Sequence, residues 1–189
     1  MKNNNILISP SILAADFSML GQEVTNVDSA GADWIHLDIM DGHFVPNLTI
    51  GPDVVSNLRK YTKKLFDVHL MTKPASNWLE PFAKAGADII TIHVEAEDNI
   101  QESIKIIKSL GLKAGISIKP SSSEKIKNIK KMINNKGRDI LIEVDGGINL
   151  ETSKLCIEAG ANVLVAGNAI FSQDASNYSK LVKSLRNET

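Results

Sequence analysis

The sequence has a single cysteine, no excess of positive or negative charge, and no long apolar run. Its single cysteine, Cys156, excludes an intramolecular disulfide, so we expect a reducing compartment and a small, buried apolar role for this residue. A net charge of -1 provides no basic surface for nucleic acid or an anionic membrane. No apolar run approaches the roughly 20 residues that span a bilayer, and the N-terminal sequence MKNNNILISPSIL lacks the apolar core of a signal peptide. These absences predict a cytoplasmic protein with neither nucleic acid nor membrane as a partner.

The pattern of apolar residues predicts a single α/β domain over residues 1–189. The chain is 43% hydrophobic and 23% charged, and its length allows a sizeable core. Leu20, Val24 and Val27 have the i, i+4, i+7 spacing of an amphipathic helix, segment 100–107 repeats it, and segment 126–133 has another such apolar stripe. Short β-branched runs alternate with these helices, at Ile6–Ser9, Trp34–Asp38, Leu65–Leu70, Ile89–Val94, Ala114–Ile118, Ile140–Asp145 and Val163–Ala166. Apolar strands that alternate with helices indicate a parallel sheet covered by helices.

One short joint occurs three times along the chain. It reads Ala30-Gly31-Ala32-Asp33, Ala85-Gly86-Ala87-Asp88 and Ala159-Gly160-Ala161-Asn162, and each copy leads from a predicted helix into a predicted strand. Glycine suits the left-handed conformation just past a helix C-terminus. Three copies of one joint therefore predict repeated βα units, as in a TIM (β/α)8 barrel.

The predicted barrel is short by one strand. Only seven of the eight strands of a (β/α)8 barrel are present, in a chain shorter than the roughly 200 residues expected. After the fifth strand, Lys119-Pro120 runs directly into Ser121 and the next predicted helix, without a glycine-rich loop. The sequence corresponds either to a seven-stranded variant or to a barrel from which one βα unit is absent.

Titratable or metal-binding side chains lie at the ends of five predicted strands. They are His36 with Asp38, Asp67 with His69, His93 with Glu95, Lys119, and Glu143 with Asp145. The i, i+2 spacing places both members of a pair on one face, and the C-terminal ends of barrel strands converge on the rim where active sites lie. Two histidines and two carboxylates gathered there would suit Zn²⁺, Fe²⁺ or Mn²⁺. The spacing leaves open whether His93 and Glu95 belong to this set or are hydrogen-bonded rim residues.

Two glycine turns follow the last two predicted strands, Asp145-Gly146-Gly147 and Ala166-Gly167-Asn168. Backbone N–H groups at such turns bind phosphate, and the loops after the last two strands are the usual phosphate site of this fold. The alternative is that these glycines serve only as tight βα turns.

Met40 and Met71 each lie two residues beyond a strand-end candidate ligand. They predict either an apolar wall beside reacting carbons or ordinary core packing.

Four segments together resemble the ribulose-phosphate 3-epimerase family. They are 9–17 (SPSILAADF), 36–42 (HLDIMDG), 67–71 (DVHLM) and 143–148 (EVDGGI), in the family's order. The resemblance implies a TIM barrel of the ribulose-phosphate binding type that interconverts D-ribulose 5-phosphate and D-xylulose 5-phosphate in the pentose phosphate pathway. It also implies one divalent metal ion per subunit (Zn²⁺, Fe²⁺ or Mn²⁺) and a small pentose phosphate as substrate, and we expect a homo-oligomer.

The resemblance also implies roles for individual residues. The family's metal ligands correspond to His36, Asp38, His69 and Asp145, and its acid/base pair to Asp38 and Asp145. Its substrate contacts correspond to Ser11, His69, Met40 and Met71, and its phosphate contacts to Gly147, Gly167 and Asn168. Many members have serine in place of Asn168, but the backbone N–H can still donate. His93 and Glu95 do not correspond to metal ligands of the family.

The chemistry of the family accounts for this set of residues. Inversion at C3 removes a proton from one face and returns a proton to the other, which requires two carboxylates on opposite sides. The intermediate is a 2,3-enediolate, whose charge a divalent metal stabilises.

The sequence departs from the family between Pro120 and Ser121. The family has a strand, a methionine-containing strand end and a glycine-rich phosphate lid there, about one βα unit of roughly 30 residues. A chain without them would have an open barrel wall, unpaired strand edges and no lid. We therefore hypothesise that the natural polypeptide contains a unit that the present sequence omits.

Three hypotheses about the function follow from the sequence. The first is the epimerase, and the second is a related barrel that acts on another sugar phosphate: an allulose 6-phosphate epimerase, a decarboxylase or an aldol-type lyase. Those lyases use a lysine with aspartates at the second and third strands, whereas this chain has His36 before Asp38 and His69 after Asp67. That difference favours the metal enzyme. The third reading, a non-catalytic phosphosugar binder, requires the deletion to be real.

Overall fold

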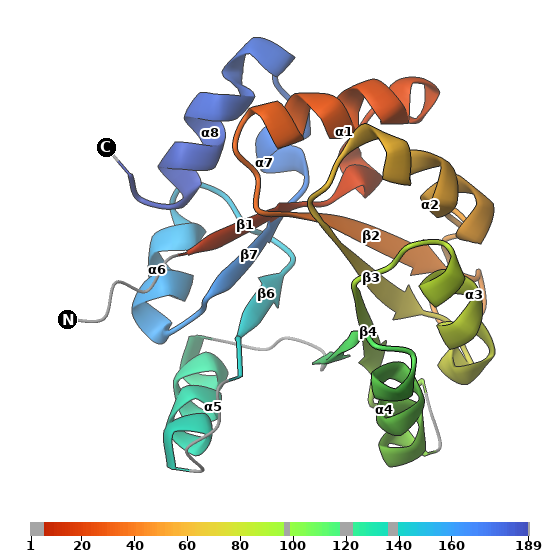
Figure 1. Cartoon of the computed structure of the whole chain (residues 1–189). Helices are drawn as coiled ribbons and strands as arrows, with labels where there is room; N and C mark the ends of the chain where they lie inside the picture. Colours follow the sequence, from red (N-terminus) through yellow and green to blue (C-terminus); the bar gives the residue numbers. More distant parts are fainter. Residues whose placement is uncertain (1–5, 97–98, 118–122, 136–139, 189) are drawn as a thin grey trace.

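The structure is a computed structural model, and it describes residues 6–96, 99–117, 123–135 and 140–188. Strands alternate with helices along the chain (Figure 1). The strands are β1 (Leu7–Pro10), β2 (Trp34–Met40), β3 (Leu65–Met71), β4 (Ile89–His93), β5 (Lys113–Ser117), β6 (Glu143–Asp145) and β7 (Val163–Ala166). The α-helices are α1 (Leu20–Ser29), α2 (Pro52–Leu58), α3 (Leu79–Lys84), α4 (Ile100–Ser109), α5 (Ser123–Asn135), α6 (Thr152–Ala159), α7 (Asn168–Phe171) and α8 (Tyr178–Leu185). Short 3-10 helices occur at Ile12–Ala14, Phe17–Met19, Arg59–Tyr61, Ala75–Trp78 and Ala175–Asn177.

The strands are parallel and follow the order of a TIM barrel. One sheet has the order β2-β3-β4-β5 and the other β1-β7-β6. A parallel bridge between Ser11 and His36 connects β1 to β2, so the strands run β6-β7-β1-β2-β3-β4-β5. Within the described residues, β5 and β6 do not pair with each other, and α4 and α5 lie on the two sides of this interruption (Figure 1). The predicted parallel α/β barrel is confirmed, with its ring interrupted where the sequence is one strand short.

The strands beside the interruption are less buried than the others. Five of the seven residues of β3 are buried, whereas no residue of β5 is. Ile116 in β5 is 44% exposed, and Ile140 and Leu141, just before β6, are 52% and 49% exposed. Parallel strands are normally covered on both faces, so this apolar exposure is what the loss of a neighbouring βα unit would produce. The Pro120–Ser121 junction and Lys119 lie outside the described residues.

The repeated joint leads into three of the strands, β2, β4 and β7, of which β2 carries candidate ligands. Gly31, Gly86 and Gly160 all adopt positive φ angles, of 91°, 99° and 107°, which glycine adopts with little cost. At the first joint the Ala32 N–H donates to Val27 O at 3.1 Å, and the other two joints have the equivalent bond. The joint therefore ends each helix in the same way and starts the next strand directly, as the repeat predicted.

The helices cover the outside of the strands and bury parts of two of the three predicted apolar stripes, whereas the stripe of α5 is only partly buried. Val24 and Val27 of α1 and Ile107 of α4 are fully buried in the main core. Cys156 on α6 is only partly buried, which corrects the prediction of a buried residue, although it packs against the edge of the main core. Desolvation of Cys156 raises the pKa of its thiol.

Among the described residues, no helix has the length and apolarity needed to cross a membrane.

Candidate active site

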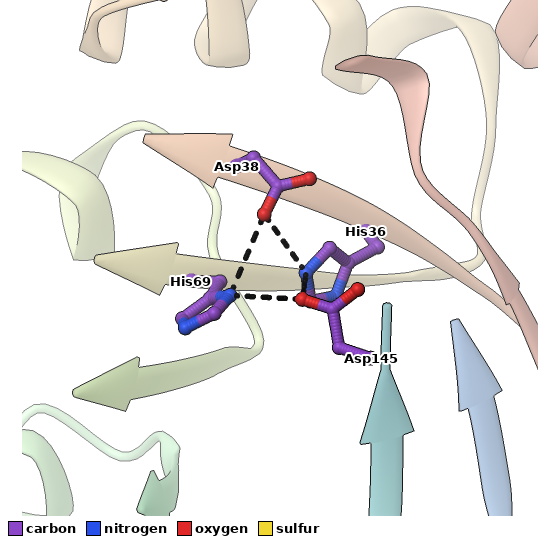
Figure 2. A group of neighbouring side chains, drawn as sticks. All are labelled: His36, Asp38, His69 and Asp145. Carbon is purple, nitrogen blue, oxygen red and sulfur yellow. Dashed lines mark ion pairs between the residues drawn. The ribbon is translucent and has the colours of Figure 1, made fainter. Parts of the chain in front are cut away.

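Four predicted ligands from three strands meet at the C-terminal ends of the strands. His36 and Asp38 come from β2, His69 from β3 and Asp145 from β6 (Figure 2). Their candidate ligand atoms all lie within 4.8 Å of one another. Asp38 Oδ1 is 3.3 Å from His36 Nε2 and 3.4 Å from His69 Nδ1, and Asp145 Oδ2 is 3.8 Å and 3.5 Å from the same two nitrogens. The structure thus brings together the four side chains that the sequence singled out.

The two histidine nitrogens that face this cluster are buried and have no hydrogen-bond partner. They are His36 Nε2 and His69 Nδ1. A buried imidazole nitrogen without a partner is costly, unless a ligand takes up its lone pair. Two imidazole nitrogens and two carboxylates form a donor set that suits a divalent transition metal. The buried group could therefore bind such an ion.

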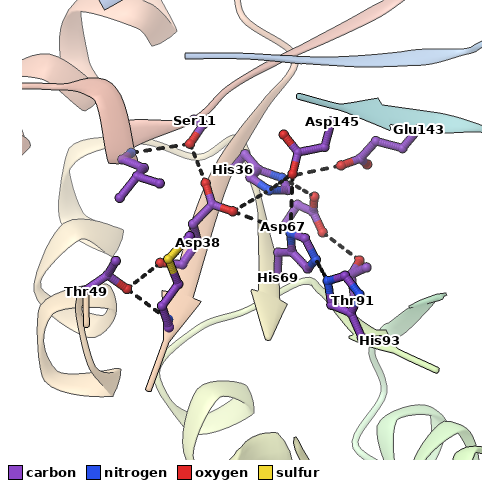
Figure 3. A network of polar contacts seen from close by, with 12 residues as sticks. Ser11, His36, Asp38, Thr49, Asp67, His69, Thr91, His93, Glu143 and Asp145 are labelled. Atoms are coloured by element: carbon purple, nitrogen blue, oxygen red, sulfur yellow. Dashed lines mark hydrogen bonds and ion pairs between the residues drawn. The ribbon is translucent and has the colours of Figure 1, made fainter. Parts of the chain in front are cut away.

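A second layer of polar side chains holds the histidines from behind (Figure 3). His36 Nδ1 lies 2.7 Å from Asp67 Oδ2, and Thr91 Oγ1 donates to Asp67 Oδ1 at 3.2 Å. His69 Nε2 lies 2.8 Å from His93 Nε2. Both histidines therefore have their outer nitrogen occupied and their inner nitrogen free, which is the usual arrangement of histidine metal ligands.

Asp38 is held in place by neighbours on both sides. Ser11 Oγ donates to Asp38 Oδ2 at 2.6 Å, which leaves Oδ1 toward the cluster. Thr49 Oγ1 donates to the Asp38 carbonyl at 2.7 Å and accepts from the Met40 N–H at 3.0 Å, so the loop after β2 ties down the end of that strand (Figure 3). Asp38 is 6% exposed, whereas the side chain of Asp145 is 39% exposed. One carboxylate is therefore fixed and enclosed, and the other is open to solvent.

The cluster strongly perturbs its ionisable groups. Burial alone would raise the pKa of Asp38, but its close contacts with the imidazoles of His36 and His69 hold it well below its usual range. Burial alone would lower the pKa of His36, but the charge of Asp67 and the adjacent carboxylates raise it well above its usual value. Desolvation and the charge of Asp67 raise the pKa of Glu143 to about 7. Strongly shifted groups gathered at a strand rim are typical of functional sites.

The predicted substrate-contacting residues lie around this cluster in two groups. Met40 and Met71 end β2 and β3 directly opposite each other and are partly buried. Gly147 has a φ of 69° in the turn after β6, and Gly167 and Asn168 form the start of α7 after β7. A side chain at Gly167 would approach Ala14 Cβ to 3.2 Å, so this position requires a small residue beside the 3-10 helix that follows Ser11.

The second layer was not separated from the metal ligands by sequence reasoning. Asp67 and Glu143 were named only as members of strand-end pairs, yet Asp67 lies behind His36, and Glu143 Oε1 is 3.4 Å from His36 Nδ1. Both lie two residues before a candidate ligand on the same strand face, but so does His36, which is itself a candidate ligand, so spacing alone did not assign Asp67 and Glu143 to the layer behind. His93 and Glu95 are not part of the four-residue group among the described residues, as the resemblance implied.

Comparison with known proteins decides the family. The sequence profile described as "Ribulose-phosphate 3 epimerase family" matches residues 7–124 and 120–171, which together cover most of the chain. The chain belongs to this family. The ribulose-phosphate 3-epimerase of Bacillus subtilis is 43% identical, over 96% of this chain and 98% of the relative. The enzyme of Chlamydia trachomatis is 38% identical over 100% of this chain and 96% of the relative.

Solved structures with low sequence identity support the same fold. A tryptophan synthase alpha-subunit from Pyrococcus furiosus is similar with a TM-score of 0.64 and 15% identity, over 97% of this chain and 98% of that chain. A phosphoribosylanthranilate isomerase from Thermotoga maritima is similar with a TM-score of 0.68 and 11% identity, over 96% and 98%. At these identities the likeness concerns the fold alone, and it agrees with the parallel barrel described above.

The alignments with members of the ribulose-phosphate 3-epimerase family place a gap in this chain. The alignment with the Chlamydia trachomatis enzyme extends over 223 residues, against 189 in the whole chain, a difference of 34. The family profile matches in two segments that meet at residues 120–124. Both findings agree with the loss of one βα unit at Pro120–Ser121.

Intact-mass spectrometry of the protein from its native source tests the hypothesis of an omitted unit. The sequence of 189 residues has a mass of 20.6 kDa. We expect a mass at least about 3 kDa higher, the contribution of one βα unit of roughly 30 residues. A mass of 20.6 kDa would show that the deletion is real and the barrel wall is open.

Proposed function

We propose that this protein catalyses the metal-dependent 3-epimerisation of D-ribulose 5-phosphate to D-xylulose 5-phosphate in the pentose phosphate pathway. The observation that carries the proposal is the cluster of His36, Asp38, His69 and Asp145, with two buried imidazole nitrogens unpaired and facing two carboxylates. Membership of the ribulose-phosphate 3-epimerase family supplies the reaction that this cluster fits. The four side chains would hold one divalent ion per subunit, Zn²⁺, Fe²⁺ or Mn²⁺.

Asp38 and Asp145 are the proposed acid/base pair. A bound divalent ion supplies positive charge that makes the proton beside the ketone more acidic and stabilises the 2,3-enediolate. Asp38 enters the site from β2 and Asp145 from β6, strands that belong to different sheets. One carboxylate removes the C3 proton from its own face, and the other carboxyl group returns a proton to the opposite face. Inversion then follows from the placement of two groups and needs no rotation of the substrate.

The remaining proposed contacts orient the substrate. Ser11 holds the outer oxygen of Asp38, which keeps the inner oxygen directed at the cluster, and we propose that Ser11 and His69 also contact the sugar. Met40 and Met71 provide an apolar wall beside the reacting carbons. Backbone N–H groups at Gly147, Gly167 and Asn168 bind the phosphate, a role that turns after the last two barrel strands often have.

We make three wider proposals, of which the single domain and the location come from composition and the absence of targeting signals. Residues 1–189 form a single catalytic barrel domain, the protein is a homo-oligomer, and it is cytoplasmic. The family implies a small phosphosugar as substrate. Sedimentation equilibrium of the purified protein tests the oligomeric state.

Proton NMR in D₂O tests the proposed reaction directly. The protein should convert D-ribulose 5-phosphate to D-xylulose 5-phosphate and introduce deuterium at C3, because the carboxyl protons exchange with solvent. A higher kcat/KM for allulose 6-phosphate would favour the second epimerase reading. A protein of 20.6 kDa that binds ribulose 5-phosphate without turnover would instead favour the binder, which the interrupted ring would explain.

A further inference from the structure

The two histidines of the cluster are supported by chemically different partners. Asp67, a buried carboxylate, lies behind His36 at 2.7 Å. The partner of His69 is another histidine, His93 at the end of β4, with 2.8 Å between the two Nε2 atoms. His93 is 7% exposed. The arrangement at Asp67 is the common one for histidine ligands, whereas a neutral acceptor behind the second histidine needs its own explanation.

The hydrogen bond between the histidines fixes which nitrogen of each ring carries the proton. His69 can offer Nδ1 to a metal only if that atom has its lone pair, so its proton must be on Nε2. The Nε2–H then donates to His93 Nε2, which must be an acceptor, so the His93 proton is on Nδ1. Glu95 Oε2 lies 3.6 Å from His93 Nδ1, on the side where a carboxylate favours that proton.

Packing holds the His93 ring in the position that its hydrogen bond with His69 requires. The His69 and His93 rings lie edge to edge and nearly coplanar, with centroids 4.9 Å apart and an interplanar angle of 21°, so the line between the two Nε2 atoms lies close to both ring planes. On another side, the Phe44 ring lies 5.2 Å from His93. Asp41 Oδ1 accepts hydrogen bonds from the backbone N–H groups of His43 and Phe44, both at 2.8 Å. The loop after β2 is thereby fixed where its Phe44 packs on His93.

We propose that His93 is a positioning residue of the metal centre, which holds His69 in the tautomer and ring orientation that present Nδ1 to the ion. This inference rests on the proposed function, because it requires a metal at the cluster. It extends the centre to a third histidine, from β4, that does not contact the ion. Loss of such a partner weakens metal binding by about 10- to 100-fold.

Cobalt binding to three variants of the metal-free protein tests this role. His93→Phe keeps a planar ring but removes the hydrogen-bond acceptor. It should raise the Kd for Co²⁺ by about 10- to 100-fold, measured from the visible absorbance of the bound ion. His93→Gln retains an acceptor oxygen and should restore most of the affinity. His43→Phe, the same substitution at an exposed histidine, is the matched control and should bind like the unsubstituted protein. Nitrogen-15 NMR of the Zn²⁺-loaded protein should place the His93 proton on Nδ1, which leaves His93 Nε2 as the acceptor.

The outcomes separate this inference from the proposed function. Failure of the unsubstituted protein to bind Co²⁺ would overturn both the metal centre and the role of His93. Unchanged affinity in His93→Phe, with normal binding by the control, would overturn the positioning role alone, as would equal losses in His93→Phe and His93→Gln. If His93→Phe does not fold by circular dichroism, the NMR result decides: a His93 proton on Nε2 in the metal-loaded protein would overturn the inference, because that atom could then not accept from His69.

Discussion

Replacement of Asp38 or Asp145 by asparagine should lower kcat for epimerisation by about 10²- to 10⁴-fold, the usual contribution of a general acid or base. Asparagine preserves the volume of the side chain but cannot take up or deliver the C3 proton. Because each face of C3 is served by one carboxylate, either substitution should stop the full reaction. Steady-state kinetics in both directions of the reaction measure the loss.

Two controls make this result specific. Asp53→Asn changes an exposed carboxylate on α2 and should leave kcat unaltered. Metal content, measured by plasma emission spectrometry, shows whether a variant has also lost its ion, since Asp38 and Asp145 are proposed ligands as well. Full activity in either variant would refute the assignment of two bases.

Removal of the divalent ion should lower turnover of D-ribulose 5-phosphate by at least about 100-fold. A bound metal is worth several kcal/mol of charge stabilisation, and each 1.36 kcal/mol is about a factor of ten in rate. The measurement is kcat after dialysis against a chelator and again after addition of Zn²⁺, Fe²⁺ or Mn²⁺. Activity should return at one ion per chain.

The fold of the chelated protein needs a parallel check. Its far-UV circular dichroism should match that of the loaded protein, because the core beneath the cluster is built from apolar residues of β1 to β4 and β7. Turnover that survives in a folded, metal-free protein would contradict the metal-dependent mechanism, although the two carboxylates could still act as acid and base.

Most of the fold could be predicted because the strands and helices have clear local patterns. The predicted strand Trp34–Asp38 is part of β2 (Trp34–Met40), and the predicted Val163–Ala166 is β7 itself. The Ala-Gly-Ala joint gave a second, independent signal, since the same turn geometry recurs at Gly31, Gly86 and Gly160. The sixth strand was the least accurate: Ile140–Asp145 was expected, whereas β6 begins at Glu143, beside the interruption.

The candidate site was predictable as far as spacing determines which strand face a residue occupies. Alternation and convergence at the barrel rim predicted that the strand-end pairs gather there, and the family resemblance selected His36, Asp38, His69 and Asp145 among them. Depth along the barrel axis was not predictable in the same way, because it depends on strand stagger. The sequence therefore could not show that Asp67 lies behind His36, nor that His93 lies behind His69.

The missing βα unit has a signal in the sequence and a visible effect on the structure. The sequence located the gap by the direct passage from Pro120 to Ser121, and the exposed Ile116, Ile140 and Leu141 are its structural consequence. Apolar side chains exposed on two unpaired edges are a liability that natural barrels avoid by closure.

Solvent deuterium exchange at C3 in Asp38→Asn and Asp145→Asn tests most directly whether the two carboxylates serve opposite faces. Each variant retains one base, so each should introduce deuterium into one epimer without inverting it, and the two variants should label different epimers. Labelling of the same epimer by both variants, or inversion by either at the unsubstituted rate, would contradict the two-face arrangement.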